Sequence, residues 1–288
     1  MRTNPKRTRR APRKTIKGLG RDRFALYEAA VQAVDYDLDF VERVHGAKRG
    51  RRFRLFREDF CATAHLAAQW VLRRPGNRAW GVDLDARPLA WCRRHRLPVL
   101  RDAARRLVLV RRDVRAVSRP LVDVVAALNF SYWVFKRRPD LLAYFRAVRR
   151  SLRPGGVFVV NAFGGTEAMT KLVEKRRIAA TNAVDGSPIG PFTYLWEHSK
   201  FNAIDHHIVC HIHFRFPDDT KMKRAFTYDW RLWTLPEIKE AMLEAGFTAV
   251  EIYVEGWDDE RNVADGVYRL RKRFPNQEGW LAYVVGRI

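Results

Sequence analysis

The stretch Leu55-Phe56-Arg57-Glu58-Asp59-Phe60-Cys61-Ala62-Thr63-Ala64, with the helical run after it and the strand Ala79-Trp80-Gly81-Val82-Asp83, decides the fold. Its pattern is an apolar strand, a loop of small residues, a helix and a second strand, with the polar run Arg57-Glu58-Asp59 expected to end the first strand. Pro75-Gly76-Asn77 supplies the turn before the second strand. Two strands joined through a helix form a parallel βαβ unit, so the stretch predicts an α/β fold.

The loop and the tip of the second strand have the features of a nucleoside site. Small residues let the backbone come close to a ligand, and a helix N-terminus presents free amides at the carboxyl ends of the strands. Asp83 follows the second strand, where an acid is placed to hold a ribose. A dinucleotide site of the NAD type is disfavoured because Gly-x-Gly-x-x-Gly is missing.

Two motifs resemble the class I S-adenosylmethionine-dependent methyltransferases. Residues 58–64 resemble the acid-x-Gly-x-Gly-x-Gly loop of that class, with Phe60, Ala62 and Ala64 at the glycine positions. The more specific match is Leu152-Arg153-Pro154-Gly155-Gly156 before the apolar strand at 157–161. Because alanine tolerates a positive φ poorly, we expect a differently built turn or a cofactor that lies slightly further from it.

The resemblance implies a fold for almost the whole chain. We expect a Rossmann-like, seven-stranded, mostly parallel sheet with helices on both faces, two helices before the loop, and a last strand that enters antiparallel. An antiparallel β lid is expected after the fifth strand, at about 187–231, where three segments alternate apolar and polar residues. A helix is predicted at 168–180 before it. Residues 21–288 would form one domain and 1–20 a disordered basic tail, while the connection at 257–276 has no assigned purpose.

The resemblance also implies S-adenosylmethionine as cofactor and a set of contacts. Glu58 would face its amino-acid end, Asp83 its ribose and Asp113 its adenine, although Asp113 is equally well a surface acid paired with a neighbouring arginine. Tyr27 is expected on a helix that covers the cofactor, with packing between helices as the alternative. The remaining predicted contacts are Phe60, Cys61, Ala62, Leu84, Val114 and Asn129.

The candidate catalytic residues are Asn129, Tyr132, His211 and Tyr228. The first two follow an apolar central strand, beside the expected methyl donor. His211 and His213 share one side of a predicted lid strand and, with Tyr228 and Trp230, are hypothesised to line an acceptor pocket; cross-strand packing is the alternative. No metal is predicted, because no third ligand has suitable spacing. Cys61 and Cys92 lack the partners of a cysteine nucleophile and are interpreted as packing residues.

Charge raises a rival function. The 288 residues carry a net charge of +23, of which +9 lies in residues 1–23. A basic tail and surface leave RNA open as a partner, and with it a tRNA or rRNA methyltransferase; a non-catalytic nucleoside- or RNA-binding scaffold is a further alternative. We favour methyl transfer to a nitrogen or oxygen of a small molecule, because a closed aromatic lid suits a ligand that it can engulf.

Localisation is predicted as cytoplasmic. Three cysteines are too few and odd in number for a disulfide framework, which indicates a reducing compartment. No apolar run approaches the length of a membrane span, and the basic N-terminus lacks the apolar core of a secretory signal. The sequence does not indicate an oligomeric state.

Overall fold

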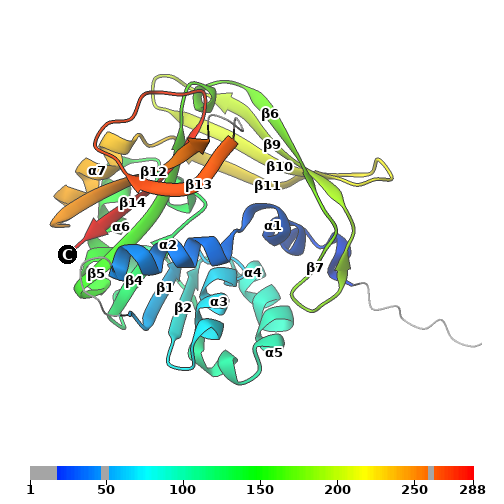
Figure 1. Ribbon diagram of the computed structural model, residues 1–288, viewed down its shortest axis with the longest axis horizontal. Coiled ribbons are helices and arrows are strands. Elements are labelled where there is room, and N and C mark those ends of the chain that lie inside the picture. The colour runs from blue at the N-terminus through cyan, green and yellow to red at the C-terminus, as the bar shows by residue number, and fades with distance from the viewer. Residues whose placement is uncertain (1–17, 47–51, 259–262) are drawn as a thin grey trace, which may run out of the picture.

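The computed structural model describes residues 18–46, 52–258 and 263–288 (Figure 1). Its main sheet has eight strands in the order β13-β12-β14-β5-β4-β1-β2-β3. The strands from β5 to β3 are parallel, whereas β14, β12 and β13 are antiparallel to their neighbours. The bounds are β1 Leu55–Asp59, β2 Arg78–Asp83, β3 Leu107–Arg111, β4 Val122–Ala127, β5 Leu152–Gly164, β12 Ala249–Asp258, β13 Val263–Leu270 and β14 Trp280–Arg287.

The predicted Rossmann-like sheet is therefore confirmed, with one strand more than expected. That strand, β13, comes from the connection at 257–276 to which the sequence assigned no purpose, and it pairs with β12 at the sheet edge.

Helices cover both faces of the sheet. The central strands have apolar side chains on both faces, so each face needs a covering layer. On β4, Val124 and Ala126 belong to the core beneath α2, α3 and the helices after β2, while Val125 and Ala127 belong to the core beneath α6 and α7. The helices of the first face are α2 Val34–Gly46, α3 His65–Arg73, α4 Ala86–Trp91 and α5 Leu97–Leu100; those of the second are α6 Arg138–Ser151 and α7 Leu235–Glu244.

The polar run Arg57-Glu58-Asp59 does not end the first strand, as the sequence suggested. β1 continues through it, and all three side chains are buried. Residues two apart share a face of a strand, so the Arg57 Nη2 donates to Asp59 Oδ2 at 3.0 Å, and the Tyr144 hydroxyl donates to the same oxygen at 2.9 Å. This pairing makes a buried charge at these positions tolerable, and it cannot be recognised from polarity alone.

An antiparallel lid follows β5, as predicted, but it begins earlier than expected. Its strands are β6 Leu172–Ile178, β9 Phe192–Phe201, β10 His207–Arg215 and β11 Lys221–Arg231, in the order β11-β10-β9-β6. The predicted helix at 168–180 is wrong: only Glu167–Met169 is helical there, and β6 pairs along its length with β9. The Lys and Arg residues that favour a helix are overridden by the pairing of an edge strand.

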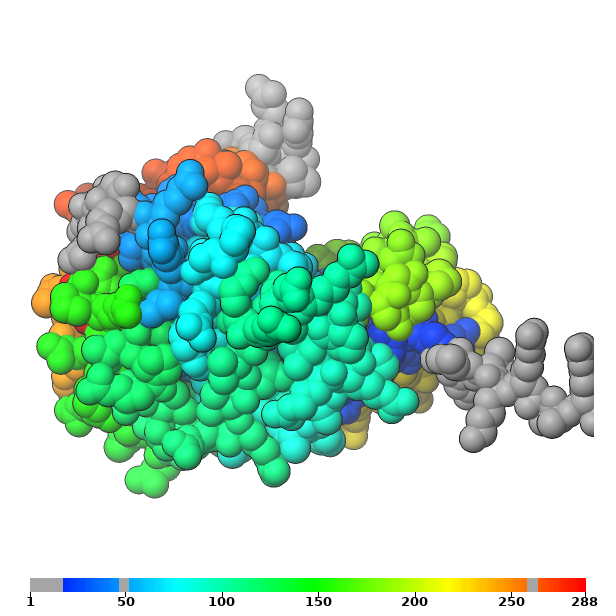
Figure 2. Space-filling model, turned by 90° about the horizontal axis from the view of Figure 1, so that it is seen from below, coloured from blue at the N-terminus to red at the C-terminus, as the bar shows by residue number. Residues whose placement is uncertain are grey.

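The N-terminal segment lies between the lid and the body, which Figures 1 and 2 show in blue. A short turn, η1 Leu19–Arg21, leads into α1 Arg23–Val31, whose first amides are capped by the Asp22 carboxylate. Leu19 is buried, and its amide donates to Ser187 Oγ at 3.1 Å. The described residues thus include 18–20, the end of the expected tail, and residues 1–17 lie outside them.

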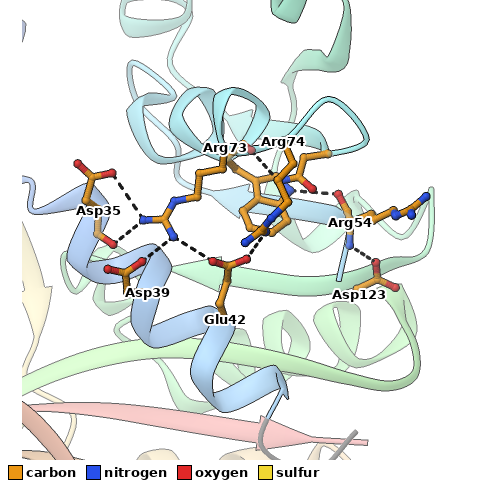
Figure 3. Close-up of polar contacts among 9 residues, drawn as sticks. Asp35, Asp39, Glu42, Arg54, Arg73, Arg74 and Asp123 are labelled. Carbon is orange, nitrogen blue, oxygen red and sulfur yellow. Dashed lines mark hydrogen bonds and ion pairs between the residues drawn. The ribbon is translucent and has the colours of Figure 1, made fainter. Parts of the chain in front are cut away.

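Ion pairs fasten α2 to α3 (Figure 3). Arg73 at the end of α3 donates to Asp39 at 2.6 Å and Glu42 at 3.0 Å, and to the Asp35 carbonyl at 2.8 Å. Arg74 pairs with the same Glu42 carboxylate. A single guanidinium that engages three residues of a helix fixes both its position and its rotation.

The C-terminal strands also hold α2. The Tyr283 hydroxyl of β14 donates to Asp37, and the Arg287 Nη2 donates to the Val44 carbonyl at 2.9 Å. From the other side, the Arg43 Nη2 donates to the Tyr268 carbonyl of β13 at 2.7 Å. The beginning and the end of the chain are thereby joined over one face of the sheet.

Candidate active site

The loop after β1 adopts a left-handed backbone at each of the three positions where glycines were expected. The φ angles are 56° at Phe60, 46° at Ala62 and 53° at Ala64. The expectation of a differently built turn is therefore wrong. A left-handed conformation costs a residue with a Cβ about 1–2 kcal/mol, so the surrounding structure has to stabilise it.

Part of that support comes from β2. The Cys61 amide donates to the Val82 carbonyl at 3.0 Å, and the Ala62 amide donates to Asp83 Oδ2 at 2.8 Å. Gly81 lets the loop lie directly on the strand, since a Cβ there would come within 3.0 Å of the Cys61 Sγ and 3.2 Å of the Ala64 Cβ. Asp83 thus shapes the loop as well as standing at the tip of β2.

Replacing Ala62 with glycine is expected to stabilise the protein by about 0.5–1 kcal/mol, because the relief of left-handed strain outweighs the added freedom of the unfolded chain. Denaturant unfolding measures this. The matched control, Ala143→Gly on the exposed face of α6, should destabilise by about 1 kcal/mol. Equal losses in both variants would contradict the strained loop.

Buried carboxylates converge behind the loop. Glu58 Oε2 accepts the Ala67 amide at 2.8 Å, and burial raises the pKa of Glu58 to about 8, with smaller contributions from the negative charges of Asp83 and Asp37. Burial likewise raises the pKa of Asp83, whose Oδ1 accepts the Asp85 amide at 2.8 Å. A cationic ligand bound there would favour the ionised carboxylates and so oppose these upward pKa shifts.

Four predicted cofactor contacts line one smaller cavity of about 400 Å³ beside the tips of β2 and β3: Phe60, Leu84, Asp113 and Val114. The Phe60 ring stands 5.9 Å from that of Phe135 and 5.5 Å from that of Tyr144. The surface ion pair expected for Asp113 is present, since its carboxylate pairs with Arg115 at 2.7 Å. Asp113 also lines the cavity, and its contact with adenine stays a prediction.

A larger cavity of about 860 Å³ lies between the lid, the ends of β4 and β5, and the first two helices. Asn129 and Phe130, directly after β4, have φ angles of 53° and 58° and turn the chain sharply into it. The Phe130 amide donates to Asn161 Oδ1 at 3.0 Å, which fixes that turn. The predicted residues Tyr27, Asn129 and Tyr228 all line this cavity, together with Phe163, Trp196 and Trp230.

The larger cavity is acidic, although the chain as a whole is strongly basic. Four carboxylates, those of Asp37, Glu167, Glu174 and Glu255, line it, against the two cations Lys175 and Arg176. Burial raises the pKa of Asp37 to about 6 and also raises those of Glu174 and Glu255.

His211 does not line the larger cavity, contrary to prediction. The pairing of Cys210 with Tyr228 places Tyr228 on the face of the lid opposite to His211. There the His211 Nδ1 lies 2.9 Å from Thr227 Oγ1, and His213 pairs with Glu197 at 2.8 Å. The alternative of cross-strand packing therefore holds for both histidines.

The prediction that Tyr132 lies at the reaction centre is also wrong. After Asn129 and Phe130 the chain forms a short turn, η5 Ser131–Val134, that sends Tyr132 into the core against Phe145. It is fully buried and does not line either cavity.

Other predictions concern residues that pack rather than react. Burial raises the pKa of the Cys61 thiol well above its usual range, so this cysteine is a packing residue beside Gly81.

Within the described ranges, His, Cys, Asp and Glu side chains do not form a cluster suited to a metal ion. The described helices are also all too short or too polar to cross a bilayer.

Sequence reasoning missed several residues of the larger cavity. Asp37 and Tyr283 come from opposite ends of the chain and meet only in the fold. Trp196 and His198 alternate on β9 toward the cavity, and this period-two pattern was a usable signal once the strand was assigned.

A family model described as "Methyltransferase domain" matches residues 58–160, the segment that contains the loop, β2 to β4 and most of β5. This segment thus matches a methyltransferase domain, in the part of the chain where the sequence resembles the class I S-adenosylmethionine-dependent methyltransferases. The predicted family is thereby confirmed, and the cofactor of this class is S-adenosylmethionine. A search of curated proteins finds no significant match to the methyltransferase.

Solved structures share the fold of the methyltransferase at low sequence identity. CalS10, an amino pentose methyltransferase from Micromonospora echinaspora, has a TM-score of 0.64 at 17% identity, covering 92% of this chain and 95% of its own. KedS8, a sugar N-methyltransferase from Streptoalloteichus, has a TM-score of 0.62 at 16% identity, covering 100% and 98%. A methyltransferase from Clostridium acetobutylicum scores 0.60 at 15% identity, covering 90% and 95%.

Proposed function

We propose that the methyltransferase methylates the nitrogen of a small amine that enters the larger cavity. The observation that carries this proposal is the acidic and aromatic lining of that cavity in a chain of net charge +23. Carboxylates and aromatic faces both attract a cationic amine, whereas a neutral hydroxyl gains little from them. The sequence alone left both a nitrogen and an oxygen acceptor open.

The cofactor fits the residues beside the loop. When bound, S-adenosylmethionine supplies a methyl group activated by its positive sulfur. In this proposal Asp83 accepts hydrogen bonds from the ribose, and Phe60, Leu84, Asp113 and Val114 surround the adenine. The left-handed turn supports this assignment, since it keeps the backbone conformation that the glycine loop of the class provides.

The remaining cofactor contacts follow from position. Glu58 and the backbone of Cys61 and Ala62 would lie along the amino-acid end, where the carboxylates converge. Tyr27 and Asn129 line the larger cavity and would stand between the cofactor and the acceptor.

The chain would contribute alignment and a proton acceptor. Aromatic walls hold the amine nitrogen in line with the methyl group and exclude water. Asp37 is suited to take the proton that the amine loses, because its pKa of about 6 leaves it ionised at neutral pH. Tyr283 donates to one oxygen of Asp37 and so orients the carboxylate.

Two structural neighbours are consistent with an amine acceptor, since one is an amino pentose methyltransferase and the other a sugar N-methyltransferase. At 16–17% identity this is an argument by analogy of fold, and the acidic cavity remains the main support.

The direct test is calorimetric titration with S-adenosylmethionine and S-adenosylhomocysteine, followed by turnover assays on small amines paired with their hydroxyl analogues. Micromolar cofactor binding and preferred turnover of amines are expected. Turnover of RNA instead would favour the rival RNA methyltransferase, and that binding should weaken steeply with salt. Cofactor binding without any turnover would favour the scaffold.

Within the lid, Tyr228→Phe is expected to raise the acceptor KM about five- to tenfold, because the lost hydroxyl interacts with that of Tyr27 at the cavity wall. His211→Ala, on the opposite face of the same sheet, should leave KM and kcat within twofold of wild type. The reverse order of effects would restore the original assignment of His211.

A further inference from the structure

We propose that Glu28 and Arg96 are positioning residues. Their hydrogen bonds to Thr63 hold the glycine-free loop at 60–64 in its cofactor-binding conformation. The inference rests on the proposed cofactor site. Neither residue lines the smaller or the larger cavity, so any effect on the cofactor has to pass through the loop.

The three side chains form one buried network. Glu28 Oε1 accepts hydrogen bonds from the Thr63 hydroxyl and from Arg96 Nη2, while Arg96 Nε donates to the Thr63 carbonyl at 3.1 Å. Arg96 and Thr63 are each 2% exposed and Glu28 is 9% exposed. Thr63 is therefore held at both its side chain and its backbone, by two residues that neutralise each other.

The position of Thr63 gives this network its significance. It lies between Ala62 and Ala64, both of which are left-handed. A glycine at either position reaches that conformation without a steric cost, whereas alanine gives up about 1–2 kcal/mol. A strained backbone conformation persists only where several surrounding contacts fix it. The hydrogen bonds that Thr63 makes with Glu28 and Arg96 are such contacts.

The Glu28 carboxylate and the Arg96 guanidinium reach the loop from separate parts of the chain. Glu28 comes from α1, the helix between lid and body, while Arg96 is the last residue of a π-helix, Cys92–Arg96, after α4. Short π-helices occur frequently at functional sites, where the extra residue redirects a side chain. Here the π-helix delivers a buried guanidinium to the loop.

The other charged or titratable groups near the network do not replace its contacts. Burial lowers the pKa of His65 to about 3, so this ring is neutral; its Nδ1 lies 3.1 Å from Gln32 Oε1. Glu58 Oε2 accepts the Ala67 amide, and the positive charge of Arg96 lowers the pKa of Glu58 against the larger effect of burial. Arg96 is therefore the cation that balances Glu28.

The same network also sets the place of α1. Glu28 follows Tyr27, which lines the larger cavity, so a helix fixed at Glu28 holds Tyr27 at the cavity wall. One buried contact thereby couples the geometry of the loop to that of the acceptor cavity.

The test measures the affinity for S-adenosylhomocysteine by calorimetry in Thr63→Val and Glu28→Gln. Thr63→Val removes only the hydroxyl and keeps the volume, so a folded protein is expected even if Glu28→Gln, which leaves Arg96 unbalanced, proves unstable. We expect each variant to bind about tenfold more weakly. Hydrogen exchange at the amides of residues 61–64 should become faster in both.

Glycine rescue separates this role from a merely structural one. Adding Ala62→Gly and Ala64→Gly to either variant should restore the affinity for S-adenosylhomocysteine to within about threefold of wild type. With glycines the loop reaches its conformation without the hydrogen bonds to Thr63. Glu42→Gln, which loosens the contact between α2 and α3 in Figure 3, should lower the unfolding temperature without changing the affinity.

The outcomes are distinct. If the wild-type protein does not bind the cofactor product, the proposed function fails. If the wild type binds and Thr63→Val and Glu28→Gln bind equally well, the positioning role is wrong. Weakened binding that glycine does not rescue would mean that the network only docks α1, and would overturn the inference as well.

Discussion

Replacing Asp83 with alanine is expected to lower the affinity for S-adenosylmethionine at least about 100-fold, or about 2.7 kcal/mol. The carboxylate has two roles whose losses combine. It accepts the amide of Ala62 at 2.8 Å and so supports the left-handed loop, and in the proposed site it also accepts the ribose hydroxyls. Hydrogen bonds to a charged group are worth about 1.5–3 kcal/mol each.

Calorimetry on Asp83→Ala, Asp83→Asn and Asp85→Ala separates these roles. Asparagine keeps one acceptor oxygen, so Asp83→Asn should lie between wild type and alanine. Asp85 caps α4 next to the site, and its loss should cost about 1 kcal/mol of stability while leaving the affinity unchanged. Binding by Asp83→Ala within threefold of wild type would refute the assignment.

Replacing Asp37 with asparagine is expected to lower kcat/KM for the amine about 100-fold and to remove a pH dependence. Burial raises the pKa of Asp37 to about 6. The carboxylate that attracts the ammonium and accepts its proton is therefore present above pH 6, and activity should fall as the pH drops through that value. The variant, which does not titrate, should lose this acid limb.

Profiles of kcat/KM against pH for wild type and Asp37→Asn measure the effect. Asp35→Asn is the matched control, because Asp35 lies on the same helix but is exposed and pairs with Arg73. An unchanged acid limb in Asp37→Asn would refute the role. If instead the cofactor affinity falls and the acceptor KM does not change, Asp37 belongs to the ammonium of the cofactor, since its charge is felt by Glu58.

The sequence predicted the parts of the fold that local pattern determines. The apolar runs of β1, β2 and β4 and the motif Leu152–Gly156 before the body of β5 each identify a buried parallel strand, and the structure contains all of them. The positions of Asp83 and Asp113 at the ends of β2 and β3 follow for the same reason, since parallel strands end at one edge of the sheet, and their contacts with a cofactor stay predictions.

The failures arise where a pairing between distant segments decides the outcome. His211 and Tyr228 lie on strands whose relative register is set by a long-range contact, and a shift by one residue exchanges the two faces. β6 contains residues that favour a helix, and only its pairing with β9 makes it a strand. Asp37 acquires its perturbed pKa from burial and its main partner, Tyr283, from the end of the chain.

The contacts between α2 and the last strands bear on how the chain is made. Tyr283 donates a hydrogen bond to Asp37, and Arg287 donates one to the Val44 carbonyl. In each pair, most of the chain is synthesised after the first residue and before the second. On the ribosome, α2 emerges early and has to wait for β14, which also separates β5 from β12 in the sheet. The wall of the larger cavity that Tyr283 forms is thus completed only once β14 has been synthesised, so a chain truncated before β14 would lack that wall.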